Sequence, residues 1–481
     1  MSRKKQIILR WDDVLGRVSD PLGINTKSSS PSNCEKPEKE LLNQTRTQRF
    51  KLARTARAIY ARAGEKAGFE YVLNYHRTAL CHYANFADVQ VNVAYEYHRA
   101  FLTGVVACGC VHTCPVCAAK IEERRRVEIS NAVDFWYSLP GKSVAMITFT
   151  FSHAVDDSLP ILLKKQAYAL ELLRSGKSWT NFTKVFGFDS LIRSFELTFS
   201  EDNGFHPHTH ELWCLDKIPS RSVVLDYLKY KYRAKKHGVL LRHLMSLSTK
   251  DIFVFLLKQR WLNCCTKAGL MTKPTGAPVD VNDFLKRSVN VRFGVSAGDY
   301  LAKQDDSRHW GVDREMSRAS TKIGRKSGVH PFAFLRKFSE TGSGIWASRW
   351  LDYSKAVSKK RRLYWSQGLK SRVGLNDLTD EEIAAKSDEY SYTVYSLTLP
   401  EWHKARMNIP AILQAAEESQ NLSLVIQSLT ELPFFTSFDV TLPPENSVKL
   451  DFIVYEKTPS KLDFYKSFTV SYAHKQAVFV F

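Results

Sequence analysis

The alternation of apolar and polar residues predicts a β-hairpin near the middle of the chain. Leu191–Ser200 carries β-branched and aromatic residues, the turn signal Asp202-Asn203-Gly204 follows, and Phe205–Leu212 leads into further apolar residues. Such side chains fit a pleated sheet, and an Asn-Gly dipeptide between two such segments is typical of a hairpin turn. Ser143–Ser152 has a similar composition and predicts another buried strand.

Helical patterns separate and flank these strands. The spacing of apolar residues predicts helices over Leu159–Leu173 and Thr249–Lys267, and the basic segment Lys229–Lys236 predicts another. A further strand is expected over Ser288–Phe293. Thr45 to Ala84 also has a helical pattern with basic residues throughout, which suits a solvated basic face as well as a helix that contacts phosphates.

Changes in composition divide the 481 residues into five predicted segments. Residues 1–45 have little apolar content beyond Trp11 and predict a flexible leader. A basic helical region with a cysteine-rich knuckle is expected over 46–138, and an α+β domain that contains the hairpin over 139–340. Residues 341–385 are a basic, aromatic segment, which suits a stacking platform for single strands; tryptophans buried in a core are the ordinary alternative. A small accessory α+β domain is expected over 386–481.

The charge balance indicates a polyanionic partner. The 69 Lys and Arg residues outnumber the 49 Asp and Glu residues, which gives a net charge of +20. Nucleic acid is the first candidate for such a protein. No run of about eighteen apolar residues is present to span a membrane, and Met1–Trp11 lacks the cleavage site of a secretory signal. We therefore expect no membrane partner.

Three histidines at alternate positions predict a metal site. Strand side chains point to opposite faces in turn, so His206, His208 and His210 share one face. Two residues advance a strand by about 6.6 Å, which lets two neighbouring imidazoles bind one ion and strains three in line. Pro207 suits a strand start or a bulge. We predict His208 and His210 as the principal ligands, with His206 as a further candidate; the alternative is a solvated strand face.

Glu196 is the candidate for a third ligand of this ion. It alternates with Phe195 and Leu197 in the preceding strand, so its carboxylate faces the side opposite to theirs. A carboxylate beside two imidazoles completes a three-ligand site with open positions for a substrate oxygen. The alternative is an exposed strand glutamate.

A cluster of cysteines predicts a structural zinc site. Nine cysteines is an odd number, and four of them lie within ten residues, which fits a reducing cytoplasm better than a secreted disulfide framework. Cys114-Pro-Val-Cys117 offers two thiolates to one tetrahedral ion, whereas a redox pair needs no further thiols. The third ligand is Cys110 or Cys108, and the fourth is the remaining one of these, His112 or the distant Cys81.

The helix after this knuckle begins with a basic run. Arg124, Arg125 and Arg126 follow the cysteines closely, so a bound zinc ion would fix them in place. We predict that they contact DNA; a solvated charged face is the alternative.

A tyrosine and a lysine close to each other suggest a nucleophile. Tyr300 begins a helical pattern and Lys303 lies three positions later, on the same face. A nearby ammonium group favours the phenolate and also attracts phosphate. Because the chain has twenty tyrosines, a packed and hydrogen-bonded residue is the ordinary alternative.

Taken together, these motifs resemble the replication initiator proteins of rolling-circle plasmids, a branch of the HUH endonucleases. The resemblance covers about residues 75 to 385. Two departures are Thr209, where the family favours a bulky apolar residue, and Ser296, where some members have a water-activating glutamate. The matching motifs are the Cys-Pro-x-Cys knuckle followed by arginines, Met146–Thr150, Glu196, His206–His210, Tyr300 with Lys303, Trp310-Gly311, Glu315, His330–Phe332 and Trp365–Leu369.

The resemblance implies a fold and a reaction. The histidine strand would lie centrally in an antiparallel sheet flanked by helices. Mg²⁺ or Mn²⁺ on His208 and His210, with Glu196 or His206, would polarise a phosphodiester. Tyr300 would attack phosphorus and keep the 5′ phosphate, which frees a 3′ hydroxyl for a polymerase, while Lys303 would neutralise the developing charge.

The resemblance also implies partners and a setting. These are single-stranded DNA, the double-stranded plasmid origin, a host helicase and a polymerase, in the cytoplasm of a bacterium or an archaeon. Asp299, Asp305, Asp306 and Glu315 are the candidates for activating water in place of Ser296. The origin sequence, the oligomeric state and the role of residues 386–481 do not follow from the sequence.

Three other classes compete with this interpretation. Conjugative relaxases usually have the tyrosine before the histidines, and single-strand transposases are usually shorter chains. A non-catalytic DNA-binding protein built from zinc clusters and basic helices would explain the charge and the cysteines, but not the histidine strand.

Overall fold

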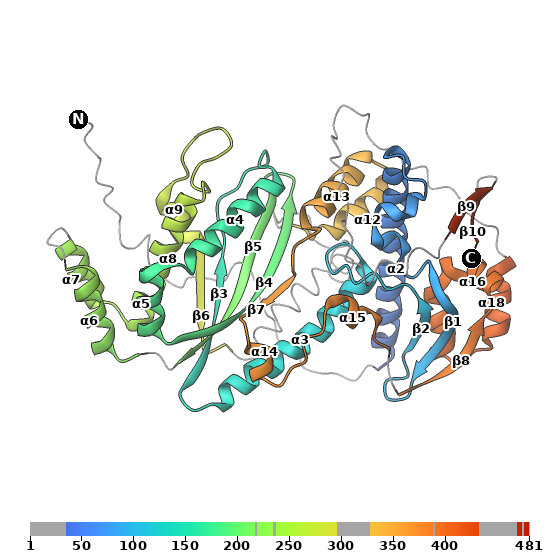
Figure 1. The fold of residues 1–481 in the computed structure, drawn as a ribbon, viewed down its shortest axis with the longest axis horizontal. Coiled ribbons are helices and arrows are strands. Elements are labelled where there is room, and N and C mark those ends of the chain that lie inside the picture. The colour runs from blue at the N-terminus through green and yellow to red at the C-terminus, as the bar shows by residue number, and fades with distance from the viewer. Residues whose placement is uncertain are drawn as a thin grey trace. The chain divides into compact units, whose positions relative to one another are not determined.

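The computed structural model describes residues 35–216, 219–233, 237–295, 328–387, 390–431, 469–473 and 476–480. These residues form two compact units, each built from segments that are distant in the sequence (Figure 1). Both units are mixed α and β with antiparallel sheets, so the expected α+β class is confirmed at that level. Among the described residues, no helix combines the length and the apolar character that a bilayer crossing requires.

Unit 1 comprises Glu122–Pro331 and Ala356–Leu378 and contains a five-stranded antiparallel sheet. The strand order is β6-β3-β5-β4-β7, so the histidine strand β5 is central, as predicted (Figure 1). Its strands are β3 (Lys142–Phe149), β4 (Phe188–Ser200), β5 (Gly204–Asp216), β6 (Val289–Phe293) and β7 (Leu363–Trp365).

One face of this sheet is covered by helices. Leu191, Trp213 and Ile147 lie on this face and are buried in the larger core of the unit. Burial of large apolar side chains stabilises the face by about 1.5–3 kcal/mol for each. The covering helices are α4 (Leu159–Leu173), α5 (Gly176–Phe186), α6 (Arg221–Lys231), α7 (Gly238–Ser246), α8 (Thr249–Lys267) and α9 (Val281–Arg287).

The opposite face is divided between a second core and the histidines. Leu212 and Ile192 pack on this face against α3 (Pro115–Ser138) and the short α14 (Leu369–Arg372). His208 and His210 have the same strand parity as Leu212, so they occupy the same face farther along β5. The apolar end of this face is therefore packed against α3 and α14, whereas the end that carries His208 and His210 is polar.

A buried ion pair lies on the helix-covered face. The Glu211 carboxylate is fully buried, is paired with Arg174 and accepts a hydrogen bond from the Trp213 indole at 2.7 Å. A buried carboxylate without its cation is costly, because neither water nor another charge compensates for it.

We expect Arg174→Met to destabilise the protein by up to about 3 kcal/mol, because it removes the ion-pair partner of the buried Glu211 and leaves only the charge of Arg193 on the neighbouring strand. The measurement is the midpoint of urea unfolding of the purified chain. Arg287→Met is the matched control, since it breaks the exposed pair with Asp283 and should leave the midpoint nearly unchanged. Equal midpoints for the two variants would contradict this view of the buried pair.

Unit 2 comprises Glu35–Ile121, Phe332–Lys355 and the described residues from Thr379 onward. Its three-stranded sheet has the order β2-β1-β8, with β1 (Asn85–Ala94), β2 (Ala100–Val105) and β8 (Ser391–Leu397). Its principal helices are α2 (Glu35–Lys66), α12 (Phe332–Thr341), α13 (Gly344–Val357), α15 (Asp380–Ala385), α16 (Leu399–Ala405), α17 (Ile409–Glu417) and α18 (Leu422–Glu431). A two-stranded pair, β9 (Thr469–Ala473) with β10 (Gln476–Val480), completes the described residues.

Two of the predicted elements differ from the structure. The helix expected from Thr45 to Ala84 ends at Lys66, because Gly68 adopts a positive φ of 72° and the chain turns there. Two short 3₁₀ helices follow, η1 (Val72–Tyr75) and η2 (Arg77–Leu80). The basic helix expected over Lys229–Lys236 is the end of α6, which begins earlier and stops at Lys231.

The other element predictions within the described residues are confirmed. Helices α4 and α8 have the predicted bounds, and the hairpin of β4 and β5 turns between Ser200 and Gly204. Residues 1–34 of the predicted leader and the alternating segment Ser447–Tyr455 lie outside the described residues. The rest of the predicted leader, residues 35–45, is not a flexible segment but the start of α2, which begins at Glu35. The five predicted segment boundaries stay a prediction. The structure adds that β8, beyond residue 386, shares a sheet and a core with β1 and β2.

Candidate metal centres

The β4–β5 hairpin brings Glu196 directly opposite His208 in register. The turn is tight because Gly204 has a φ of 72°, and a Cβ there would come within 2.9 Å of the Val155 backbone. His210 is paired with Ser194 on one side and with Thr148 of β3 on the other. Three strands thus contribute to one polar patch at the end of the sheet face.

The three predicted ligands Glu196, His208 and His210 converge on one point. Glu196 Oε2 lies 3.1 Å from His208 Nε2 and 2.9 Å from His210 Nε2. The potential ligand atoms of the three residues all lie within 4.8 Å of one another, an arrangement that could hold a metal ion. Two imidazoles and a carboxylate form a donor set that suits divalent transition metals. The residues therefore fit a divalent ion.

The protonation equilibria of the cluster are strongly coupled. Burial alone would raise the pKa of Glu196, but the charges and hydrogen bonds of His208 and His210 outweigh it and hold that pKa well below its usual range. Burial alone would lower the pKa of His208, but Glu196 outweighs it and raises that pKa above the ordinary value. The site thus favours a carboxylate with a cationic partner, which is the charge pattern that a metal ion would replace.

Neighbouring groups orient both imidazoles. The Thr148 hydroxyl lies 2.9 Å from His210 Nδ1, and the His206 carbonyl lies 3.3 Å from His208 Nδ1. In both rings Nε2 is therefore the atom that faces Glu196. Such partners fix ring orientation in metal sites. Thr148 was not singled out from the sequence, although its strand parity within Met146–Thr150 could have identified it.

His206 lies outside the convergent group. Its ring stacks on His153 at a centroid distance of 4.7 Å, and burial lowers its pKa to about 3. His153 is held in turn by the Asn203 carbonyl, 2.8 Å from its Nδ1. Sequence reasoning missed His153, which lies in the loop after β3 and has no periodic signal.

We expect the affinity of the protein for Mn²⁺ to fall as the pH is lowered from about 8 to about 6. Protons compete with the metal for His208, and its raised pKa places the onset of competition at a higher pH than for an ordinary histidine. Each displaced proton should cost about tenfold in affinity per pH unit once the pH is below that pKa. Titration calorimetry at several pH values measures this, and a flat profile would contradict it.

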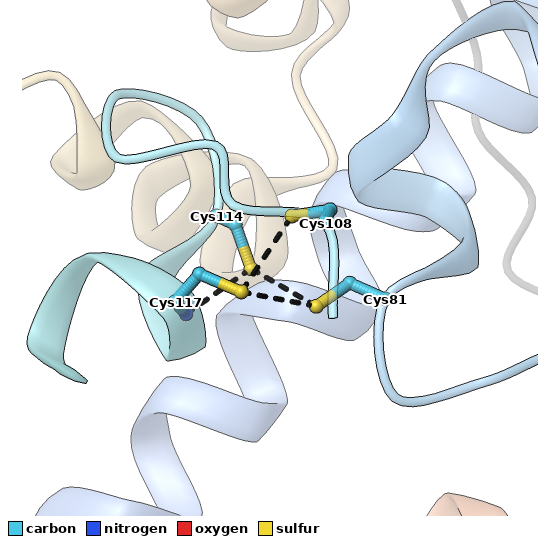
Figure 2. A group of neighbouring side chains, drawn as sticks. All are labelled: Cys81, Cys108, Cys114 and Cys117. Atoms are coloured by element: carbon cyan, nitrogen blue, oxygen red, sulfur yellow. Dashed lines mark hydrogen bonds between the residues drawn. The ribbon is translucent and has the colours of Figure 1, made fainter. Parts of the chain in front are cut away.

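Four buried cysteines of unit 2 form a second cluster (Figure 2). The Sγ atom of Cys81 lies 3.4 Å from that of Cys117 and 3.5 Å from that of Cys114, and Cys108 and Cys117 are separated by 3.7 Å. These distances exceed a disulfide bond. Tetrahedral zinc with bonds of about 2.3 Å requires about 3.8 Å between sulfurs. The four thiols therefore fit a structural zinc ion.

Local structure positions each of these thiols. Pro115 starts α3, and the Cys117 amide donates to Cys114 Sγ at 3.4 Å, which closes the knuckle. Cys81 follows η2, and the partly buried Arg57 donates from its guanidinium to the Cys81 carbonyl at 3.1 Å. Burial raises the pKa of Cys108 well above its usual value, so ionisation of this thiol needs a compensating cation.

Two other candidates for zinc ligation lie outside this cluster. The sulfur of Cys110 is 3.6 Å from the Cys108 carbonyl, and Cys110 is not among the four convergent residues. His112 is buried beside the knuckle, where its carbonyl accepts a hydrogen bond from the Tyr353 hydroxyl at 3.0 Å. The sequence left the third and fourth zinc ligands open. The structure brings Cys108 and the distant Cys81 together with Cys114 and Cys117.

The arginines after the knuckle differ in their surroundings. Arg125 pairs with Glu128 at 2.8 Å and donates to the Leu378 carbonyl at 2.6 Å. Arg126 pairs with Glu123 at 2.6 Å, whereas half of the Arg124 side chain is exposed. Arg125 thus holds the unit together, and DNA contact by this group of arginines stays a prediction.

The predicted nucleophile Tyr300 and its neighbour Lys303 lie outside the described residues, as do Ser296 and the candidates for activating water. Their roles therefore rest on the sequence alone.

The fold and the two clusters define an α+β protein with a candidate divalent-metal site on a sheet and a candidate zinc site. The sequence is similar to a protein named Protein rep from Streptomyces lividans, with 25% identity over 314 residues, which are 57% of this chain and 65% of that protein. It is also similar to the Neomycin resistance protein of Streptomyces cyanogenus, with 28% identity over 137 residues, 24% of this chain and 31% of that one. The chain thus spans less than two thirds of either relative. No protein-family model and no solved structure matches it.

Proposed function

We propose that this chain is the replication initiator of a rolling-circle plasmid and belongs to the HUH endonucleases. It nicks one DNA strand at the origin through a tyrosine, leaves a 3′ hydroxyl as a primer and later rejoins the strand. The observation that carries the proposal is the convergence of Glu196, His208 and His210 on one face of an antiparallel sheet. The similarity to Protein rep supports the plasmid setting.

In this proposal Glu196, His208 and His210 hold one Mg²⁺ or Mn²⁺ ion. When bound, the ion supplies Lewis-acid chemistry that draws electron density from a phosphodiester oxygen. The residues themselves orient the ion, because Thr148 and the His206 carbonyl fix the two rings. The three side chains are only partly buried, so the cluster stays open to a substrate.

The bond exchange rests on residues named from the sequence. The Tyr300 oxygen bonds to phosphorus and gives up its proton, while the bond from phosphorus to the 3′ oxygen breaks and that oxygen takes up a proton. The 5′ phosphate remains on the tyrosine, and Lys303 neutralises part of the charge that develops. Attack by the 3′ hydroxyl on the phosphotyrosine reverses the exchange and rejoins the strand.

The rest of the chain fits a DNA-bound protein. A net charge of +20 supplies the attraction to phosphates, and a zinc ion on Cys81, Cys108, Cys114 and Cys117 would fix the start of α3. Single-stranded DNA and the duplex origin are the proposed partners. A host helicase and a polymerase in a bacterial or archaeal cytoplasm would use the nicked product.

The test is capture of DNA from a pool of random single-stranded oligonucleotides. The full chain is incubated with the pool and Mn²⁺, with or without chelator, and covalent adducts are isolated under denaturing conditions and sequenced. We expect adducts that share one sequence and form only without chelator. A non-catalytic zinc protein would bind the pool and leave every strand uncut in both conditions, and that outcome would overturn the proposal.

A further inference from the structure

An arginine at the edge of the sheet lies close to the Glu196 cluster. The Arg362 carbonyl accepts a hydrogen bond from the Phe195 amide at 2.9 Å, and the next residue, Leu363, is paired with Ser194. Phe195 immediately precedes Glu196 on β4. The Arg362 backbone is therefore fixed beside the strand that carries the carboxylate, and it is the last cation of a basic run that starts at Lys359.

The side chain of Arg362 turns toward the face that bears the cluster. Its guanidinium pairs at 3.3 Å with Glu122, near the start of the part of α3 that belongs to unit 1. Helix α3 packs on the same sheet face as His208 and His210. Only 17% of the Arg362 side chain is exposed, so the cation is held in a defined place. Its charge is also among those that act on the pKa of His208, in the lowering direction.

A guanidinium carries five N–H donors in a planar fork that matches phosphate oxygens, and Glu122 is paired through Nη2. Attack on a phosphodiester adds negative charge to its non-bridging oxygens, and a cation already in position stabilises that charge.

We propose that Arg362 contacts a non-bridging oxygen of the phosphodiester bound at the Glu196–His208–His210 cluster. The inference rests on the proposed function and extends it with a residue from outside the recognised motifs. Glu122 neutralises the guanidinium in the DNA-free protein, and the phosphate replaces it when DNA binds.

The test compares two variants that break the same ion pair. Arg362→Gln removes the cation, whereas Glu122→Gln removes its partner and keeps the cation. If the ion pair has only a structural role, both variants should lose DNA binding and cleavage; if Arg362 contacts phosphate, only Arg362→Gln should. Arg362→Lys keeps the charge without the planar fork. Binding of a mixed-sequence single-stranded 20-mer is followed by fluorescence anisotropy across salt concentrations, and single-turnover cleavage is measured with an oligonucleotide captured from the random pool. Thermal unfolding reports whether each variant is folded.

We expect Arg362→Gln to reduce the slope of log affinity against log salt by about 0.7, the loss of one single-strand phosphate contact. Cleavage should fall by about 10²–10³-fold, with Arg362→Lys intermediate and Glu122→Gln within about threefold of the parent protein. Equal losses in Arg362→Gln and Glu122→Gln, or an unchanged salt slope in Arg362→Gln, would overturn the inference. If the parent protein does not cleave while the slope still falls, the phosphate contact stands and the nicking function fails.

Discussion

Tyr300→Phe should abolish the covalent attachment of DNA to the protein and leave binding of single-stranded DNA within about twofold of the parent protein. Without the phenolic oxygen no bond to phosphorus can form, whereas the Glu196 cluster and the basic surface are unchanged. The measurement is a denaturing gel of the full chain with a labelled oligonucleotide and Mn²⁺. We expect no detectable adduct, because the covalent bond to phosphorus cannot form at any rate when the attacking oxygen is missing.

Tyr168→Phe provides the matched control for this experiment. Tyr168 lies on α4 in unit 1 and is 48% exposed, so its hydroxyl is accessible in the same fold. This variant should form as much adduct as the parent protein. Mass spectrometry of the digested adduct should find the nucleotide on the peptide that contains Tyr300; a nucleotide on another tyrosine would show that the nucleophile is wrongly assigned.

Cys117→Ser should remove zinc from the protein and destabilise unit 2. The thiolate of Cys117 lies centrally in the cluster, with Cys81 at 3.4 Å and Cys108 at 3.7 Å. Binding of structural zinc contributes about 10–16 kcal/mol in zinc-finger peptides. This is comparable to the entire stability of an ordinary domain, about 5–15 kcal/mol, so losing the ion should destabilise unit 2 strongly. The bound metal is measured by mass spectrometry of the purified protein, and the folding of the unit by limited proteolysis.

Cys110→Ser is the matched control, because it removes a thiol that lies near the zinc site without being one of its proposed ligands. Cys110 lies in the same loop but outside the four convergent thiols, so this variant should keep about one zinc ion per chain and resist the protease as the parent protein does. If Cys110→Ser loses zinc and Cys117→Ser retains it, the proposed ligand set is wrong.

Local patterns were sufficient to predict four of the five strands of the unit 1 sheet and the helices α4 and α8. Two helices had the predicted bounds, and the hairpin turn followed from Asn203-Gly204, because each depends on residues close together in the sequence. The strand period also placed His208 and His210 on one face. The same reasoning gave Glu196 the correct face, since the hairpin fixes its register against His208.

The sequence could not predict pairings between distant segments. Strand β8 joins β1 with Val91 opposite Tyr395, and no local pattern identifies a partner so far along the chain. Cys81 likewise reaches the knuckle only because α2 ends and two 3₁₀ helices follow, which the helical pattern did not indicate. Arg362 lies beside Phe195 because the chain returns to unit 1 after residue 355, and the spacing of residues in the sequence does not predict this return.

The interleaved chain order has a consequence for synthesis on the ribosome. The sheet of unit 1 can pair β3, β4, β5 and β6 soon after translation passes residue 293, but its edge strand β7 is made later. Strands β1 and β2 are synthesised early, and the free edge of β1 has no partner until β8 has been made. During that interval the nascent chain exposes an unpaired strand edge, a state prone to aggregation and to capture by chaperones. Fragments that end before residue 391 should therefore be poorly soluble in cells.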